Sequence, residues 1–359
     1  MNINPIDIKS LITEIRQEYS AQYTLYLSFG ECHVSVSCNN QEIIKDLSLY
    51  YKPFLSTSNF SDIHITVHES EQININSTLK QNLPEPGKRK IKEEYIDIQD
   101  GRIVRKKLTG LVFIFGSGNH LCIGPCKINL NQVVNFINNR YIEFLLCKGC
   151  LLGHASGIAL NKKGLAIAGF AGAGKSTMSL HLMSQGVSFV SNDRLMIEQQ
   201  NGKLIMHGIA KLPRINPGTI LNNPDLSTIL DEESKKNFSK MSIEELWHLE
   251  EKYDVPIDEC FKGSNFTLKA EMIGLVILNW KKGNMPFKIN EVSLHERFDL
   301  LPAFMKSSGL FFYPSENSNI AVPNLENYSN LLSLCKVWEF SGGIDFDAAT
   351  SVCLDLIKN

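Results

Sequence analysis

The chain has 359 residues, 43% of them hydrophobic and 21% charged, and a formal net charge of −2. This composition is typical of globular proteins, and the length suits about two domains. Because the charge is nearly balanced, the sequence gives no sign of the basic surface that binds nucleic acid or acidic membranes. We therefore expect neither as a partner.

The sequence also carries information about the cellular compartment. Residues 1–9 are polar and lack the layout of a signal peptide, and no apolar run reaches the roughly 18 residues of a membrane span. The nine cysteines are odd in number and scattered, which favours reduced thiols and predicts a cytoplasmic protein. Two closely spaced pairs allow either a zinc site or ordinary buried thiols, the interpretation that we favour: Cys122 with Cys126, and Cys147 with Cys150.

The N-terminal region predicts a small α+β domain, residues 1–82. Its strands are indicated by alternating apolar and polar residues. Residues 77–90 include two prolines, a glycine and several charges, which is typical of a linker. The expected elements are strands at 23–29, 33–37 and 63–67 and a helix at 41–51.

The second predicted domain covers residues 93–359 and begins with short strands. Asp100 and Gly101 are typical of a hairpin turn between the first two of these strands. Residues 131–147 carry apolar side chains at close to a 3.6-residue period, which predicts a helix packed on one face. The expected strands are 95–98, 102–108 and 111–115.

The strongest motif is a glycine-rich segment between a predicted strand and a predicted helix. Residues 169–176 read GFAGAGKS and satisfy the P-loop pattern G-x-x-x-x-G-K-[ST]. The apolar run 164–169 before it predicts a strand buried on both faces, and residues 177–184 after it have helical character. Gly186 is placed to end that helix before the next strand, 187–190.

The residues of this segment suit the binding of a nucleoside triphosphate. Glycines let backbone N–H groups face phosphate oxygens, and the helix that follows presents its positive end to the same anion. Lys175 would neutralise the terminal phosphates, and Ser176 would hold Mg²⁺ through its hydroxyl. The predicted nucleotide-binding residues of the loop are Gly169, Gly172, Ala173, Gly174, Lys175, Ser176 and Thr177.

Phosphoryl transfer also needs an acidic residue for the metal ion and a group that orients the nucleophile. Asp193 follows the predicted strand that ends at Val190, where it could face the phosphates, or it could simply shape a turn. His154 lies just before the strands that lead to the loop and is a second candidate, although a lone histidine is often structural.

These residues resemble the HPr kinase/phosphorylases, and most closely the group called HPr-kinase-related kinase B. The resemblance to that group extends over nearly the whole chain, whereas the resemblance to HPr kinase itself covers about residues 140–220. It implies an α/β P-loop kinase domain of the HPr kinase/phosphoenolpyruvate carboxykinase type, preceded by the small α+β domain. The segments that carry it are GHASGIAL, LAIAGFAGAGKSTMSLHLM, FVSNDRLMI, KLPRINPGT, LWHLEEKYDV, NQVVNFINNRYIE and KEEYIDIQDGRIVRKK.

The resemblance assigns roles to individual residues. It implies that His154 approaches the γ-phosphate, that Lys175 and Ser176 are the P-loop pair, and that Asp193 is the second of two adjacent aspartates. The first aspartate, the general base of HPr kinase, is replaced here by Asn192. An amide cannot accept the proton, so either Asp193 or His154 takes that role, or positioning and metal charge suffice, or transfer is slow.

Later segments hold further candidates. Lys211 and Arg214 lie in a proline-fixed turn and could donate to phosphate or substrate, or could be solvated charges. From the family likeness, Lys306 is expected in a loop near the nucleotide. Residues 247–255 mix aromatic and acidic side chains, and we interpret them as a structural helix rather than as a metal site.

The sequence therefore predicts an ATP- and Mg²⁺-dependent kinase that acts on a hydroxyl of a protein, a peptide or a small molecule. Two alternatives share the same loop: an ATP-binding regulatory module or pseudokinase, and an ATPase. The resemblance to HPr kinases further implies a homo-oligomer.

Overall fold

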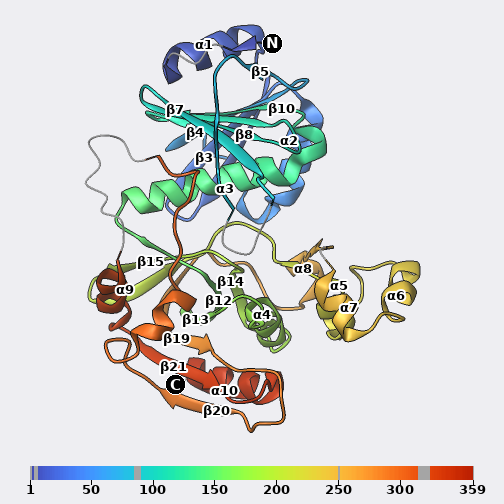
Figure 1. The fold of residues 1–359 in the computed structure, drawn as a ribbon, viewed down its shortest axis with the longest axis vertical. Coiled ribbons are helices and arrows are strands. Elements are labelled where there is room, and N and C mark those ends of the chain that lie inside the picture. Colours follow the sequence, from blue (N-terminus) through green and yellow to red (C-terminus); the bar gives the residue numbers. More distant parts are fainter. Residues whose placement is uncertain (1, 4–6, 85–89, 250, 314–323, 359) are drawn as a thin grey trace. The chain divides into compact units, whose positions relative to one another are not determined.

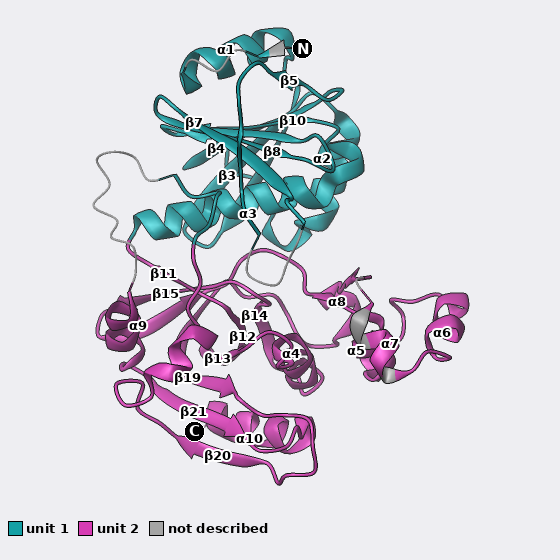
Figure 2. Ribbon diagram, viewed as in Figure 1, with its two compact units in different colours: residues 1–148, 308–321 teal, residues 149–307, 322–359 magenta. Residues whose placement is uncertain are grey.

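The computed structural model describes residues 2–3, 7–84, 90–249, 251–313 and 324–358 (Figure 1). The chain forms two compact units, each assembled from two stretches of sequence (Figure 2). Unit 1 contains residues 1–148 and 308–321, and unit 2 contains residues 149–307 and 322–359.

This division differs from the domains expected from the sequence, 1–82 and 93–359. Strand β6 (Lys80–Gln81), in the expected linker, pairs with β7 (Glu93–Ile98), and both belong to one sheet. The polar, proline-containing stretch between them is a connection within a sheet rather than between domains. Residues 85–89 of that stretch lie outside the described residues.

Unit 1 is built on an eight-stranded sheet in the order β2-β3-β4-β10-β9-β8-β7-β6. Helices α1 and α3 lie on opposite sides of it (Figure 1). Alternate residues of β9 face these helices: Ile114 joins the apolar cluster under α1, and Phe113 packs against Phe136 of α3. The elements are β1 (Asn2–Ile3), α1 (Ile8–Glu18), β2 (Tyr23–Phe29), β3 (Cys32–Cys38), α2 (Gln41–Tyr50), β4 (Ile63–Glu69), β5 (Asn74–Ile75), β8 (Gly101–Lys106), β9 (Val112–Gly116), β10 (Asn119–Gly124) and α3 (Leu130–Cys147).

Most local predictions for this region are confirmed, including the helices α2 and α3 and the strands β2, β3 and β4. The hairpin also forms, but its turn comes one residue earlier than expected. Ile98 pairs with Gly101, so the turn residues are Gln99 and Asp100, and Asp100 takes the left-handed conformation with φ of 65°.

Residues 308–313 complete unit 1 although they are far from it in the sequence. The ring of Phe311 stacks on Phe115, with 5.8 Å between the ring centroids. Arg140, a fully buried residue of α3, donates to the carbonyl of Phe311 and forms an ion pair with Glu143. Arg102 donates to the carbonyl of Leu310 at 2.9 Å. A late segment therefore supplies partners for buried polar groups of the early sheet and helix.

Unit 2 is built on a nine-stranded sheet with the order β11-β15-β16-β19-β13-β12-β14, in which β21 pairs with β19 and β20. Its strands are β11 (Leu151–Gly153), β12 (Ala155–Leu160), β13 (Lys163–Gly169), β14 (Ser188–Ser191), β15 (Leu195–Gln200), β16 (Lys203–His207), β19 (Lys269–Leu278), β20 (Lys288–Glu291) and β21 (Lys336–Ser341), with a separate pair β17 (Arg214–Ile215) and β18 (Tyr253–Asp254). Its helices are α4 (Lys175–Met183), α5 (Pro217–Leu221), α6 (Glu232–Phe238), α7 (Ile243–His248), α8 (Ile257–Cys260), α9 (Leu325–Leu332) and α10 (Phe346–Lys358).

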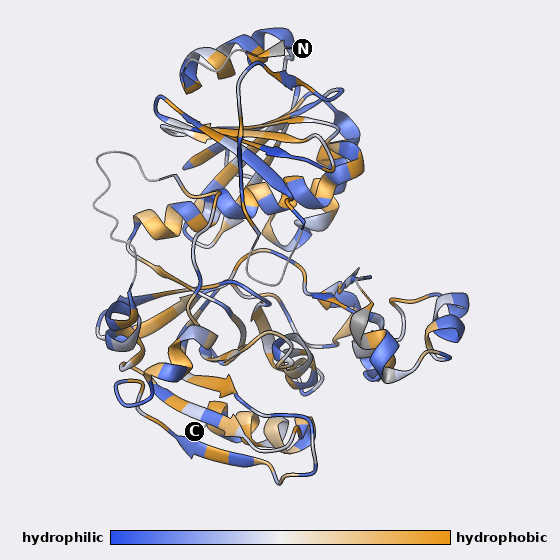
Figure 3. Ribbon diagram, in the orientation of Figure 1, coloured by the Kyte–Doolittle hydropathy of each residue, from blue (hydrophilic) through white to orange (hydrophobic). Residues whose placement is uncertain are grey.

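Both faces of the central strands of unit 2 are covered, as the unbroken apolar run 164–169 predicts. Leu165 and Ile167 join a core with α4 and α10, whereas Ala166 and Ala168 join a core with the 3₁₀ helix Phe298–Ala303 and α9. Figure 3 shows hydrophobic residues along these strands and hydrophilic residues on the outlying α6. The chain is thus a mixed α/β protein, as expected, and its narrower assignment to the HPr kinase type stays a prediction.

One local expectation for unit 2 is wrong. Residues 247–255 do not form one helix, because α7 ends at His248 and Tyr253–Asp254 forms β18 with Arg214–Ile215. Pairing with a distant strand outweighs the local helical preference of this acidic segment. Of the helices in the described part of the chain, none combines the length and apolarity needed to cross a bilayer.

Candidate functional site

The glycine-rich loop joins the end of β13 to the start of α4. The helix begins at Lys175, and Gly174 before it takes the left-handed conformation with φ of 90°. A Cβ at Gly174 would lie 2.8 Å from the ring of Phe346, so only glycine suits this position. The indole of Trp280 donates to the carbonyl of Ala173 at 2.8 Å and fixes the loop from the side. The first N–H groups of α4 have no helical acceptors and can bind an anion.

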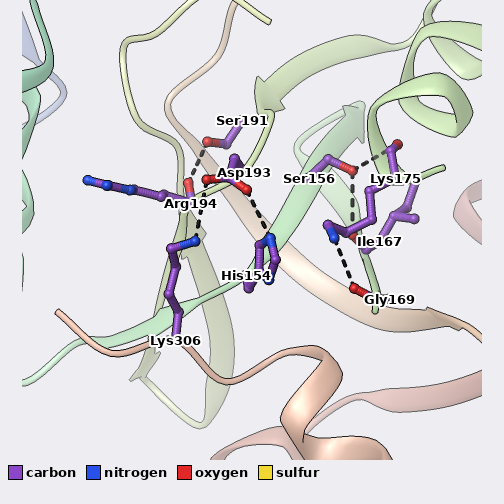
Figure 4. A network of polar contacts seen from close by, with 9 residues as sticks. All are labelled: His154, Ser156, Ile167, Gly169, Lys175, Ser191, Asp193, Arg194 and Lys306. Atoms are coloured by element: carbon purple, nitrogen blue, oxygen red, sulfur yellow. Dashed lines mark hydrogen bonds and ion pairs between the residues drawn. The ribbon is translucent and has the colours of Figure 1, made fainter. Parts of the chain in front are cut away.

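The side chain of Lys175 folds over this loop and contacts its first residue. Its Nζ donates to the carbonyl of Gly169 at 2.9 Å, at the end of β13 (Figure 4). Burial lowers the pKa of Lys175, the nearby Asp193 opposes that shift, and the charge of Lys306 adds to it. A phosphate oxygen could replace the carbonyl of Gly169 as the acceptor and would compensate the buried charge.

Two buried serines hold the first turn of α4 against β12. Ser179 donates to Ser156 at 2.6 Å, and both hydroxyls lie within hydrogen-bond distance of the carbonyl of Lys175, at 3.2 and 3.3 Å. This contact fixes the backbone position of Lys175. Sequence reasoning misses the role of both serines, because each is an unremarkable residue of a regular element.

A second group of charged residues lies beside Lys175. His154 Nε2 is 2.9 Å from Asp193 Oδ1, and Lys306 Nζ is 3.4 Å from Asp193 Oδ2 (Figure 4). Burial raises the pKa of Asp193, but the hydrogen bond from His154 and the charge of Lys306 outweigh it and hold that pKa well below its ordinary value. Asp193 is therefore a carboxylate at neutral pH. The structure brings together three candidates that are widely separated in the sequence.

The backbone of this group is fixed by the segment before Lys306. His154 N donates to the carbonyl of Phe304 at 2.5 Å, and Lys306 N donates to the carbonyl of Leu152 at 3.2 Å. The phenol of Tyr328 donates to the same Leu152 carbonyl at 2.6 Å. The positions of His154 and Lys306 are therefore coupled through main-chain contacts, which the sequence does not reveal.

Gly153 allows this close approach, and its replacement by alanine should destabilise the protein. A Cβ at this position would lie 2.4 Å from the ring of Phe304. We expect Gly153→Ala to lower the free energy of unfolding by about 1–3 kcal/mol, measured by urea denaturation, because the core must shift to admit the methyl group. Gly218→Ala is the matched control, since its nearest contact would be an ordinary 3.5 Å to Leu246. Equal stability of the two variants would contradict the packing argument.

Asn192 lies next to this group but contributes no charge. Its Oδ1 atom is buried and accepts no hydrogen bond from any residue that the structure describes. A buried acceptor without a donor is costly, which suits a position where a ligand or a water molecule supplies the missing partner.

Ser176 and Thr177 occupy the first turn of α4. Thr177 Oγ1 lies 3.5 Å from Thr219 Oγ1, and the side chain of Asn216 caps α5, which contains Thr219, by accepting from the Thr219 N–H at 3.0 Å. Thr177 thus contacts the neighbouring segment, whereas Ser176, next to Lys175, is the residue suited to a metal ion at the phosphate site.

The turn after β16 adds further positive charge. Burial lowers the pKa of Lys211 to about 8. The positive charges of Arg194 and Arg214 also lower this pKa, whereas the negative charges of Asp193 and Asp254 oppose the shift. Arg214 Nε forms an ion pair with Asp254 Oδ1 at 3.2 Å. Lys211 is therefore within electrostatic reach of Asp193, whereas the guanidinium of Arg214 is already paired with a residue of the neighbouring strand.

The donor set fits a phosphorylated ligand with Mg²⁺. The start of α4 and Lys175 offer N–H donors, and Ser176 and Asp193 offer the oxygen ligands that Mg²⁺ prefers. The roles of these residues, and of Gly169, Gly172, Ala173 and Gly174 in the loop, stay predictions.

No family model matches the chain, and no curated protein does. Among solved structures, the HPr(Ser) kinase/phosphatase from Coxiella burnetii is similar, with 15% identity, a TM-score of 0.28, and coverage of 58% of this chain and 94% of that one. Membership of the HPr kinase superfamily, and of the narrower kinase B group, stays a prediction.

Proposed function

We propose that this chain transfers the γ-phosphoryl group of ATP to a hydroxyl group on a protein, a peptide or a small molecule, with Mg²⁺ as the metal ion. The observation that carries the proposal is the pairing of His154 with Asp193 within electrostatic range of Lys175, the lysine of the glycine-rich loop. A phosphate site alone would serve any nucleotide-binding protein. A histidine and carboxylate beside it supply groups that phosphoryl transfer needs.

The phosphate groups would lie against the start of α4. The N–H groups there and Lys175 would bind the oxygens whose charge changes during transfer, and such electrostatic stabilisation provides most of the rate enhancement in this class of reaction. Ser176 and Asp193 would hold Mg²⁺, which neutralises charge on the terminal phosphates. Lys306, now paired with Asp193, would exchange that contact for one with a phosphate oxygen.

His154 is the best candidate to accept the proton of the attacking hydroxyl. Its Nε2 faces Asp193, so the Nδ1 atom carries the lone pair when the neutral ring donates to the carboxylate. Asp193 would then orient the ring and stabilise the imidazolium that forms, as a carboxylate does behind a catalytic histidine. Asn192 cannot take this proton, and the low pKa of Asp193 makes it a weak base.

Nucleotide binding should change the protonation of Lys211. At pH 8 this side chain is about half protonated, because its pKa is lowered to about 8. A bound phosphate raises that pKa, so we expect ATP binding at pH 8 to take up roughly half a proton. Calorimetry in buffers of different ionisation enthalpy measures the uptake.

Lys211→Met should abolish this uptake, whereas Lys203→Met, at an exposed lysine paired with Glu271, should leave it unchanged. If the Lys211→Met variant still takes up the same amount, Lys211 does not lie near the phosphates.

An acceptor screen tests the proposed activity directly. The purified chain is incubated with γ-labelled ATP, Mg²⁺ and a cell lysate fractionated into proteins and small molecules. We expect label to appear in a defined acceptor with the wild-type chain, and mass spectrometry then identifies the modified hydroxyl. Absence of labelled acceptor with any divalent metal ion would count against a kinase, and phosphate release without an acceptor would indicate an ATPase.

One observation favours a second candidate function, a nucleotide-binding module without rapid transfer. Asn192 stands where the resembling kinases place a catalytic aspartate, and its buried Oδ1 lacks a donor among the described residues. Tight ATP binding by calorimetry, with transfer gained only in Asn192→Asp, would support this candidate. Turnover by the unmodified chain would exclude it.

A further inference from the structure

Three residues with metal-binding side chains meet away from the glycine-rich loop, in unit 2. Cys150, Glu198 and His207 each bring one ligand atom, and these atoms all lie within 4.8 Å of one another. His207 Nε2 is 2.8 Å from Glu198 Oε1. Cys150 is closely spaced with Cys147 in the sequence, but the structure places it with residues 48 and 57 positions later in the chain.

The register of three neighbouring strands explains this meeting. Leu151 pairs with Ile197 in the antiparallel ladder of β11 and β15, so Cys150, just before β11, comes opposite Glu198. On the other side of β15, His207 pairs with Met196. Glu198 is two residues from Met196 and therefore on the same face as His207, within reach of a diagonal contact. The cluster thus follows from the sheet register and not from flexible loops.

We infer that Cys150, Glu198 and His207 bind a zinc ion. Thiolate, imidazole and carboxylate are the three side-chain types that zinc takes, and three protein ligands with a water molecule in the fourth position make a tetrahedral site. Metal–ligand distances of about 2.0–2.3 Å place ligand atoms about 3.3–3.7 Å apart in such a site. The spread of these three atoms, from 2.8 Å to at most 4.8 Å, reaches that range by small side-chain rotations.

The burial of the three side chains suits an ion that enters from one side. Cys150 is 3% exposed, whereas the side chains of His207 and Glu198 are 10% and 24% exposed. Glu198 therefore marks the side from which an ion and a water molecule, as fourth ligand, reach the cluster. The thiol at the inner end is shielded, which favours retention of the metal.

The ion would hold together the strands that carry the candidate catalytic pair. His154 follows β11 directly, and Asp193 lies two positions before the start of β15. Cys150 and His154 are four positions apart, which corresponds to about 13 Å of strand. β16 ends at His207, four residues before Lys211. A zinc ion bound there would thus fix three strand positions at once. This positioning role rests on the proposed function, but zinc binding does not.

Metal analysis of the full chain tests the inference. The purified protein is loaded with Zn²⁺, dialysed and analysed by mass spectrometry for metal content, and Co²⁺ replaces Zn²⁺ as a spectroscopic probe of thiolate ligation. We expect one Zn²⁺ per chain and a cobalt–thiolate absorption band in the wild type. Cys150→Ala and His207→Ala should each weaken zinc binding by more than the roughly 10- to 100-fold that loss of a group behind a metal ligand costs.

Cys147→Ala is the matched control, because Cys147 is the exposed cysteine of the same C-x-x-C spacing and lies outside the cluster. It should retain the ion and the absorption band. Where an alanine variant fails to fold, Glu198→Gln, which keeps the shape of the side chain, replaces it and should also lose affinity. No stoichiometric zinc in the wild type, or equal binding by all variants, would overturn the inference.

Discussion

Replacing Lys175 with alanine should lower the rate of phosphoryl transfer by roughly 1,000-fold, the loss seen when one charge-stabilising donor is removed from an enzyme site. Lys175 is the cation at the start of α4, and its Nζ currently donates to the carbonyl of Gly169. Because its burial lowers its own pKa, the folded chain holds this charge at a cost that a bound phosphate would offset. Initial rates with labelled ATP and the acceptor from the screen measure the effect.

The control for this variant is Lys163→Ala. Lys163 is an exposed lysine at the start of β13, the strand that ends at the glycine-rich loop, so both variants lose one positive charge connected to the same element. Lys163→Ala should transfer phosphate at the wild-type rate. If the two variants behave alike, Lys175 has no special role and the proposed phosphate site is wrong.

Replacing Asp193 with asparagine should lower the turnover number by about 100- to 10,000-fold. The amide can no longer stabilise a protonated His154, and it offers Mg²⁺ a neutral oxygen in place of a charged one. Since His154 and Lys306 hold the pKa of Asp193 well below its ordinary value, the wild-type carboxylate stays ionised at neutral and mildly acidic pH. A pH dependence of the rate near neutral pH would then come from a group other than Asp193.

Rate measurements over that pH range separate the two residues. With His154 as the base, His154→Ala should lose most of the activity, together with any part of the wild-type pH dependence that comes from the base. Asp258→Asn, at an exposed carboxylate of α8, should keep both the rate and the pH profile. A His154→Ala variant that keeps the wild-type rate and pH dependence would show that His154 is not the base.

The local elements of the fold can be predicted from the sequence because their signals are local. The apolar run 164–169 and the glycines after it identify a buried strand and a tight loop, and β13 and α4 follow as expected. The expected start of the helix is two residues late, since the sequence does not show that Gly174 caps it. Pairing between distant strands cannot be predicted from such local signals. Strand β18 is an example, because its partner β17 lies 38 residues earlier.

The candidate site shows the same limit. Lys175 belongs to a motif that can be read directly, whereas the contact between Lys306 and Asp193 joins residues 113 positions apart. Short spacing groups Cys150 with Cys147, a pair that the sequence leads us to interpret as ordinary thiols. The sheet register instead brings Glu198 and His207 to Cys150. Spacing in the chain predicts a site only where one loop or one helix forms it.

The return of residues 308–313 to the early sheet has a consequence for any attempt to divide this protein. A fragment ending at residue 148 would keep Arg140 but lose the carbonyl of Phe311 that accepts its hydrogen bond, and it would uncover the rings of Phe113 and Phe115. Such a fragment should aggregate, because a buried arginine loses a hydrogen-bond acceptor and a cluster of aromatic side chains becomes exposed to solvent. Each unit is therefore compact in space but interleaved with the other in the sequence, so a recombinant unit 1 needs its late segment grafted back.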